Sequence, residues 1–268
     1  MRKSIALFLT LSFLTILLFI LSLIFDVYQK ETKQNFSYIY QNSLNIKSIL
    51  NILNKIDIKE INSSKDLKFI FKSLPISSKD GNFRLFIKIE PLFNRININK
   101  IVKNGKINNS IYEYLQNILR YYNIKNSDMF IEYIIATIKG DDLIKEIPYK
   151  DYKKGLFTKR KFQKLLNFFK KYDKKITFID WDKYLIFEKK SYLDCDLINK
   201  DVKKFLEIPQ NSNCKNINEY LNKERLKELD IIPFNKQNFL INITLNSINI
   251  KYDLAKKKVI SIENHPIY

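Results

Sequence analysis

The sequence predicts an α+β fold in which a long N-terminal helix precedes an antiparallel β-sheet with a large helical domain inserted into it. Three observations predict this fold. The chain opens on an uncharged apolar run, two β-rich stretches lie far apart in the sequence, and short amphipathic segments fill the interval between them. We expect five regions, which are residues 1–4, 5–25, 26–95, 96–232 and 233–268.

The apolar run Ile5–Phe25 predicts a transmembrane helix. It contains no charged residue, and a helix of this length, rising about 1.5 Å per residue, spans the roughly 30 Å hydrocarbon core of a bilayer. No small-residue cleavage site of the secretory type follows it, so we expect the anchor to be retained. Arg2 and Lys3 favour a cytoplasmic N-terminus with the rest of the chain on the outer side. A buried core helix is the alternative.

The helical pattern continues beyond this run. Apolar residues recur at helical spacing up to about Ile58, and neither Gly nor Pro interrupts Met1–Leu74. We therefore expect an amphipathic helix to extend from the anchor. Two β-rich runs around an Asp-Gly turn signal follow it, and they predict strands at Leu67–Ile76 and Asn82–Ile89.

The interval from residue 96 to residue 232 is rich in short amphipathic segments. Capping signals mark two of them: Ser127 and Asp128 before the second, Gly140 after it, and Asn199 with Asp201 at the start of the fourth. We expect helices within Asn109–Asn123, Ser127–Gly140, Thr158–Asp173, Asn199–Pro209 and Ile217–Asp230.

Strands return in residues 233–268. From Phe239 to Leu245 every second residue is apolar and most of the others are polar, and the alternation continues to Tyr252. A polar turn at Asp253–Lys258 then leads to a last strand from Val259. We expect these strands to complete the sheet that begins before the helical interval.

The net charge of +19 raises nucleic acid or an anionic membrane surface as partners. The excess is mostly Lys, and it accompanies high usage of Asn, Ile, Phe and Tyr. Codons rich in A and T produce this composition whatever the function. No nucleic-acid partner is therefore expected.

The two cysteines, Cys195 and Cys214, predict one disulfide if the chain lies outside the cytoplasm. Two unpaired thiols are the alternative. A structural zinc site is not expected, because it needs four ligands and the chain has a single histidine, His265.

No catalytic or cofactor motif is found, so we expect a non-enzyme without a cofactor. The chain has no phosphate loop, HExxH, GxSxG or GxGxxG. Trp181 is interpreted as a packing residue. The paired carboxylates lack the spacing of an EF-hand loop and are interpreted as solvated turn residues; they are Asp141 with Asp142, Asp180 with Asp182, and Asp194 with Asp196.

The opening "RKSIALFLTLSFLTILLF" resembles that of the K-type minor pseudopilins of type II secretion systems, the GspK family. In that family a short basic leader ends in Gly before an apolar helix, and Ser4 takes the place of that Gly here. The resemblance implies that prepilin peptidase removes the leader, residues 1–4, by cutting between Ser4 and Ile5, and methylates the new N-terminus. Leu9 fits as well, because the family lacks the glutamate that major pilins carry at the fifth mature position.

Further likenesses follow along the chain. Asn97, Asn99 and Ile101 match the family's N-x-N-x-(L/I) element. The stretch "FIEYIIATIKGDD" falls where the family has an acidic segment, and Asp141 and Asp142 retain its final acidic positions, which makes them calcium candidates by resemblance. The stretch "SYLDCDLINKDVKKFLEIP" is similar to the family's I-N-x-N-T-A-x-x-x-L-x-x-L element without its Asn and Thr-Ala positions.

The resemblance implies a pilin-like sheet with an inserted helical domain and a role in assembly rather than catalysis. The chain would cap or initiate a periplasmic pseudopilus, with other minor and major pseudopilins, prepilin peptidase and the inner membrane as partners. It would cross the bacterial inner membrane once, with the bulk of the chain in the periplasm. The alternatives are a tip subunit of a type IV pilus or competence pseudopilus, a membrane-tethered DNA-binding protein and a signal-anchored periplasmic enzyme.

Overall fold

The structure is a computed structural model of the whole chain, and it divides into two compact units, Met1–Ile56 and Asp57–Tyr268. The residues that it describes are 46–47, 49–51, 53–57, 61, 63, 66–67, 71, 73–77, 84–140, 158–188, 191–237, 239–245 and 248–264. Among them, no helix has both the length and the apolar character needed to cross a bilayer. The predicted transmembrane helix 5–25 lies outside the described residues.

In the first unit the structure describes a short stretch of helix, residues 46–47, 49–51 and 53–54. Ile49 and Leu53 are buried, whereas Asn51 and Asn54 are exposed. This one-sided burial is the pattern expected for the amphipathic part of the predicted N-terminal helix.

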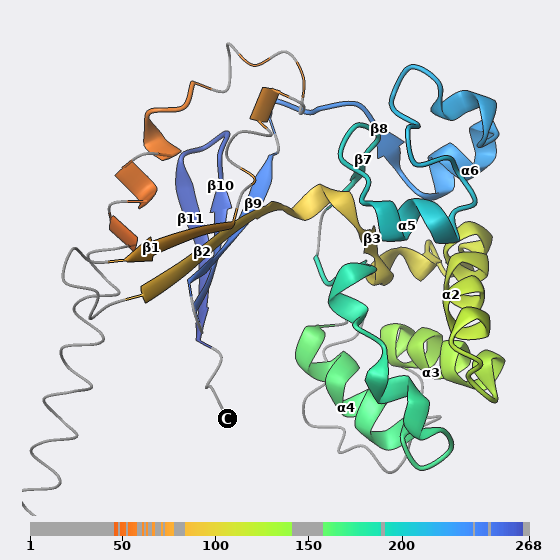
Figure 1. Cartoon of the computed structure of the whole chain (residues 1–268). Coiled ribbons are helices and arrows are strands. Elements are labelled where there is room, and N and C mark those ends of the chain that lie inside the picture. Colours follow the sequence, from red (N-terminus) through yellow and green to blue (C-terminus); the bar gives the residue numbers. More distant parts are fainter. Residues whose placement is uncertain are drawn as a thin grey trace, which may run out of the picture. The chain divides into compact units, whose positions relative to one another are not determined.

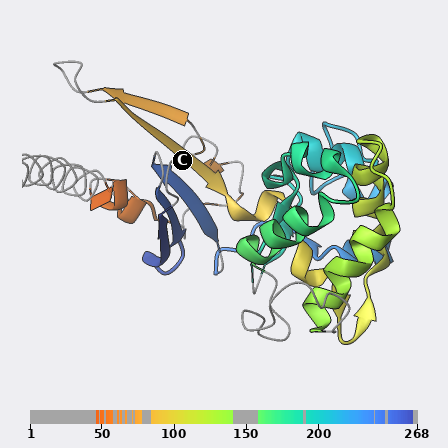
Figure 2. The ribbon, with the colours of Figure 1, turned by 90° about the horizontal axis from the view of Figure 1, so that it is seen from below.

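The second unit contains a five-stranded antiparallel sheet whose strands come from both ends of the unit (Figure 1). The strand order is β1-β2-β9-β10-β11, and every neighbouring pair is antiparallel. β2 and β9 lie side by side in the sheet although the helices described within residues 92–228 come between them in the sequence (Figures 1 and 2). The strands are β1 Ser73–Ser77, β2 Arg84–Pro91, β9 Leu240–Leu245, β10 Ile248–Asp253 and β11 Lys258–Asn264.

The sheet has one apolar face and one polar face, as the predicted alternation requires. Each cross-strand row draws residues of one kind from β2, β9 and β10. The rows of the apolar face are Ile87-Leu245-Ile248, Ile89-Ile243-Ile250 and Pro91-Ile241-Tyr252, and those of the polar face are Lys88-Thr244-Asn249 and Glu90-Asn242-Lys251.

The first two predicted strands are present, but their bounds were wrong. We expected Leu67 to begin a strand, whereas Leu67 lies with Asp66 in a 3-10 turn that is closed by hydrogen bonds between Ser63 and Asp66. The strand begins at Ser73. β1 is an edge strand, and this position tolerates Pro75, whose missing N–H would break the hydrogen-bonding ladder of a central strand.

Among the residues that the structure describes, five α-helices lie between β2 and β9 in the sequence, and Figure 1 shows them grouped away from the sheet. The α-helices are α2 Asn109–Tyr121, α3 Ser127–Lys139, α4 Lys159–Phe169, α5 Lys200–Phe205 and α6 Lys223–Glu228. The 3-10 helices are η3 Leu92–Asn94, η4 Ile98–Ile101, η6 Lys174–Phe178, η7 Trp181–Lys183 and η8 Ile217–Glu219. We call residues 96–232 the insertion.

The insertion also contains pairs of two-residue strands that the sequence did not predict. They are β3 Ile96–Asn97 beside β6 Leu185–Ile186, β4 Val102–Lys103 beside β5 Lys106–Ile107, and β7 Leu193–Asp194 beside β8 Ile231–Ile232. β3 with β6 and β7 with β8 are parallel pairs between distant segments. Such short strands carry too few residues to show a period of two.

The helix caps confirm part of the prediction. Asn199 caps α5, because its side chain accepts a hydrogen bond from the N–H of Val202. Gly140 ends α3 at φ 79°, in the left-handed region that a glycine adopts without strain. The predicted cap before α3 was wrong: Asn126 holds that position, and Asp128 accepts hydrogen bonds from Tyr112 and Gln116 of α2 instead.

The predicted helix Ile217–Asp230 was wrong as a single element. It is divided into η8 and α6. Asn222 stands between them in an extended conformation and accepts a hydrogen bond from the N–H of Arg225. An Asn side chain that bonds the backbone in this way starts a new helix instead of continuing the old one.

The core of the insertion is built on aromatic rings. Phe130 of α3 packs against Phe162 and Phe169 of α4, with ring centroids 6.2 and 4.9 Å away. Trp181 closes the group and donates a hydrogen bond from Nε1 to the carbonyl of Ile176 at 3.2 Å. Trp181 is thus the packing residue that the sequence predicted.

Candidate functional site

A cleft of about 790 Å³ lies between the sheet and the insertion. Its sheet wall is the polar face already described, to which β2, β9 and β10 each contribute side chains. Alternation thus has two consequences: it buries the apolar side chains on one face, and it directs polar side chains into the cleft on the other. The wall consists of Lys88, Glu90, Asn242, Thr244, Asn249 and Lys251.

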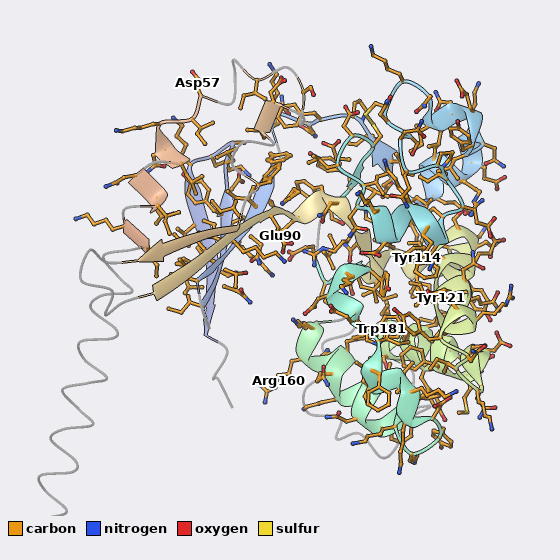
Figure 3. All side chains as sticks on the ribbon, viewed as in Figure 1. Asp57, Glu90, Tyr114, Tyr121, Arg160 and Trp181 are labelled. Carbon is orange, nitrogen blue, oxygen red and sulfur yellow. A yellow bond between two sulfur atoms is a disulfide. The ribbon has the colours of Figure 1, made fainter. Side chains whose placement is uncertain are left out.

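The opposite wall comes from segments of the insertion that are far apart in sequence. The N-terminal end of α4 contributes Lys159 and Arg160, the region of η7 contributes Asp180 and Asp182, and α5 contributes Asp201. Figure 3 shows Arg160 projecting outward from α4.

Most charges of the cleft are paired with one another. Lys159 lies 2.6 Å from Asp182, Lys183 lies 3.5 Å from Asp180, and Lys88 lies 2.7 Å from Glu90. Exposed pairs of this kind contribute about 0–1 kcal/mol each. No His, Cys or Ser is among the described residues that line the cleft. This arrangement suits polar contacts with a partner surface.

Two contacts connect the walls. Lys251 of β10 forms an ion pair with Glu188 at 2.8 Å, and both side chains are largely shielded from solvent. Just before the insertion, Phe93 of η3 is fully buried between Tyr192, with centroids 4.1 Å apart, and Phe239, with centroids 5.9 Å apart. The ring stack joins the insertion to the chain segment that enters β9.

Asn97 connects β3 to the segment that follows β6. Its Nδ2 donates to the carbonyl of Glu188 at 2.7 Å and to Oγ of Ser191 at 2.8 Å. Its Oδ1 accepts from the N–H groups of Asn99 and Glu188. Asn99 adds a bond to the same Glu188 carbonyl at 3.2 Å. The N-x-N motif thus holds the residue that carries the ion pair with Lys251.

Lys100 extends this connection. Its Nζ donates to the carbonyl of Ser191 and lies 2.7 Å from Asp230, just before β8. One short stretch, from Asn97 to Lys100, therefore holds two distant parts of the insertion. These pairings could not be predicted from the sequence, because the partners are about ninety or more positions away.

The structure joins Cys195 and Cys214 by a disulfide with Cα atoms 4.9 Å apart. The bridge closes a loop that contains α5. Beside it, the fully buried Asp194 accepts a hydrogen bond from the N–H of Asp196 at 2.9 Å, and Asp196 accepts one from the N–H of Cys214 at 3.4 Å. The Asp194 and Asp196 pair thus caps backbone groups around the disulfide.

The described residues do not fit a metal site at this position. Oxygen and sulfur atoms of Asp194, Cys195 and Cys214 lie within 4.8 Å of one another. Both sulfurs belong to the disulfide and are therefore not thiolate ligands. Ca²⁺ needs six or more oxygen ligands, whereas this group of three residues offers a single carboxylate.

Buried tyrosines belong to the core of the insertion. Burial raises the pKa of Tyr114 well above its usual value of 10.0, and the neighbouring Tyr184 raises it further. The Tyr114 hydroxyl donates to the carbonyl of Tyr184 at 3.2 Å. Burial and the hydrogen bond with Tyr122 likewise raise the pKa of Tyr184. These hydroxyls stay protonated at neutral pH and act as structural donors.

Several predicted site residues lie outside the described residues. They are the leader junction Ser4 and Ile5 and the calcium candidates Asp141 and Asp142. The predictions made for them stay predictions.

The chain is similar to a solved structure, whereas its sequence matches no family model and no curated protein. A chain in the crystal structure of the GspK-GspI-GspJ complex, from the type 2 secretion system of enterotoxigenic Escherichia coli, matches with a TM-score of 0.55. The match covers 89% of this chain and 100% of that chain at 8% identity.

The chain has a GspK-like pseudopilin fold. The antiparallel sheet with its helical insertion matches the architecture that the resemblance implied. At this identity the likeness establishes the arrangement of elements, and it does not transfer the role of any single residue. The solved neighbour is a chain of a type 2 secretion system complex.

Proposed function

We propose that the chain is a minor pseudopilin of a type II secretion system that caps or initiates a periplasmic pseudopilus. One observation carries the proposal: the GspK-like fold extends over the whole length of the matched chain, sheet and insertion together. The leader-like N-terminus of the sequence supports it independently.

In this proposal the run Ile5–Phe25 anchors the chain in the inner membrane before assembly. Prepilin peptidase removes Met1–Ser4 and methylates Ile5, and the same apolar helix then packs against the helices of neighbouring pseudopilins. Lipid tails and leucine side chains are equally apolar, so the exchange depends on packing and on specific polar partners. Leu9 offers no charge for a partner above it, which suits a tip position.

The proposed partners are other pseudopilins, because the solved neighbour is a complex of GspK with GspI and GspJ. The N-terminal helix and the sheet are the proposed contact surfaces. The bulk of the chain is placed in the periplasm, where an oxidising environment maintains a disulfide such as Cys195-Cys214.

N-terminal mass spectrometry tests the proposal. The full chain is expressed with and without prepilin peptidase. We expect a mature N-terminus at methylated Ile5 only when the peptidase is present. Ser4→Gly should be processed at least as well as the natural chain, and Ser4→Leu, which places a bulky side chain at the junction, should stay intact. An unprocessed Met1 in the presence of active peptidase would contradict the proposal.

Co-purification tests the partners. The processed chain should form a stable complex with the I-type and J-type minor pseudopilins of the same secretion system. If it associates instead with the minor subunits of a type IV pilus or competence pseudopilus, the assignment to secretion is wrong while the pilin class stands. If it associates with neither, the proposal fails.

A further inference from the structure

The C-terminal end of α4 and the adjoining η6 form an exposed surface that the pseudopilin role does not use. We call it the α4-η6 patch, and it comprises Lys125 and residues 170–178. Two of its lysines directly follow α4, two lie in η6, and all five lysines are exposed; they are Lys125, Lys170, Lys171, Lys174 and Lys175. Two aromatic side chains, Tyr172 and Phe178, are 42% and 81% exposed.

Phe178 is the unusual member of the patch. In the same 3-10 helix the side chain of Ile176 is fully buried, whereas the phenyl ring of Phe178 is exposed to water. Side chains three residues apart are eclipsed in a 3-10 helix. Lys175 and Phe178 therefore share one face, which presents an ammonium group beside an apolar ring.

The patch carries more positive than negative charge in its own sequence. Its one acidic residue, Asp173, accepts hydrogen bonds from the backbone N–H groups of Lys125 at 2.8 Å and Lys175 at 2.9 Å. Those bonds fix the carboxylate against the backbone, where it caps η6. The one carboxylate within the patch is thus already used by backbone groups.

Side chains of the patch pack against aromatic rings of α4. Nζ of Lys171 lies 4.0 Å from the ring centroid of Phe168 and 5.1 Å from that of Tyr172. Tyr172 packs in turn against Phe168 and Phe169, with centroids 6.0 and 5.5 Å away. Phe169 belongs to the core of the insertion. The exposed groups are therefore held in place by buried ones.

We propose that the α4-η6 patch binds the surface of a membrane that contains anionic phospholipid. The ring of Phe178 inserts at the boundary between headgroups and acyl chains, and the lysines bind lipid phosphates. Lysines around an exposed apolar ring are the pattern of interfacial membrane attachment, in which apolar burial and attraction to anionic headgroups add.

The shape of the surface favours a membrane over a nucleic acid. Proteins that bind single strands hold them in a positively charged groove lined by aromatic rings. The cleft of this chain is lined by the opposite end of α4, Thr158–Arg160, and its charges are mixed. The patch presents a protruding ring, which suits a deformable, flat surface. This inference does not rest on the pseudopilin role.

A vesicle-capture experiment tests the inference. The full chain is immobilised through a C-terminal tag, with its N-terminal segment held in a neutral phosphatidylcholine nanodisc. Vesicles of phosphatidylcholine, with or without phosphatidylglycerol, are passed over it at low and high salt. We expect capture of the vesicles that contain phosphatidylglycerol, weakening as salt rises, and little capture of neutral vesicles.

Matched variants assign the binding to the patch. Phe178→Ser should abolish capture, whereas Ile107→Ser, at another exposed apolar position, should not change it. Lys174→Gln with Lys175→Gln should weaken capture about twenty-five-fold, taking about fivefold for each Lys at an anionic surface. The charge-matched control, Lys200→Gln with Lys215→Gln, should weaken it far less.

Three outcomes would overturn the inference. Equal capture of neutral vesicles would show that the anchor region is responsible. Equal losses in the patch variants and their controls would show a general effect of charge. Tighter binding of a single-stranded oligonucleotide, lost in the same patch variants, would assign the surface to nucleic acid. Circular dichroism of each variant confirms that the fold is retained.

Discussion

At the residue scale, Asn97 is the side chain on which the geometry of the cleft depends most. Replacing it with Ala leaves the carbonyl of Glu188 and the hydroxyl of Ser191 without this donor. We expect Asn97→Ala to lower the free energy of unfolding by about 2 kcal/mol. Urea titration measures it through the fluorescence of Trp181, the single tryptophan, which is buried in the insertion.

The control for this variant is Asn242→Ala. Asn242 lies on the open polar face of the sheet and makes one side-chain bond, to Thr244 at 3.3 Å. Its loss should change the urea midpoint only slightly. If the two variants were equally destabilising, the proposed role of Asn97 would be wrong.

Because Tyr114 is buried, we expect the folded chain to lose stability at alkaline pH. Burial raises its pKa well above 10.0 in the folded chain, so the unfolded chain loses this proton first. The stabilisation is complete below pH 10 and declines as the pH rises further, by up to about 1.4 kcal/mol for each pH unit. Tyr114→Phe should be less stable at pH 7, because a hydrogen bond is lost, but should lose less stability between pH 10 and pH 11. Parallel curves would contradict this assignment.

Local rules predicted some residue roles and missed others. Asn199 and Gly140 were predicted as caps, because a cap depends on a few neighbouring residues. The network of Asn97 was not predicted, since its partners lie about ninety positions away and become neighbours only when β3 pairs with β6. Asp128 shows that a tertiary hydrogen bond can compete with a local cap, because it accepts hydrogen bonds from α2 instead of capping α3.

At the element scale, the disulfide should be the main restraint on the loop that contains α5. Its cysteines are 19 positions apart, and a loop of that size corresponds to about 3 kcal/mol of stabilisation. Cys195→Ala with Cys214→Ala should therefore lower the urea midpoint. A reductant should lower the midpoint of the natural chain to the same value and leave the variant unchanged. Free thiols detected in the untreated natural chain would contradict the pairing.

A substitution on the edge strand β11 should change the solubility of the chain without changing its stability. Ile262 is 58% exposed, and its strand pairs with β10 alone among the described strands. An exposed apolar edge invites pairing between molecules, and a lysine on such an edge discourages it. Ile262→Lys should reduce light scattering on concentration at nearly unchanged urea midpoint. Ile250→Lys, on the buried neighbour in the same row, should prevent folding. An Ile262→Lys variant that aggregates as before would contradict this role of β11.

Elements with a strong period were predicted best. The alternation in residues 239–252 predicted β9 and β10 together with the face that each residue occupies. The segment Ile217–Asp230 has a helical pattern throughout, yet Asn222 divides it. A helical pattern shows which side chains are apolar. It does not show where a polar side chain, such as that of Asn222, will hydrogen-bond to the backbone and start a new helix.

At the scale of the whole molecule, the order of elements was more predictable than any motif. The sheet is built from two ends of one unit, and the sequence shows this because strand periods stand on both sides of a helical interval. The match to the GspK-like fold at 8% identity has the same basis. The positions of apolar residues determine the fold, and many sequences satisfy the same positions. The cleft could not be predicted, since it forms only when the insertion packs beside the sheet.

The proposed division of labour, between an anchor at residues 5–25 and a unit in the periplasm, yields the last prediction. Deleting residues 5–25 removes the only uncharged run long enough to span a bilayer, whereas Asp57–Tyr268 forms a compact unit with its own sheet and core. The deleted chain should therefore be released from membranes by carbonate yet retain the urea midpoint of Trp181 fluorescence. The natural chain should resist carbonate, and alkaline phosphatase fused to its C-terminus should be active, because that end is proposed to lie in the periplasm. An inactive fusion would reverse the orientation, and carbonate release of the natural chain would remove the anchor from the proposal.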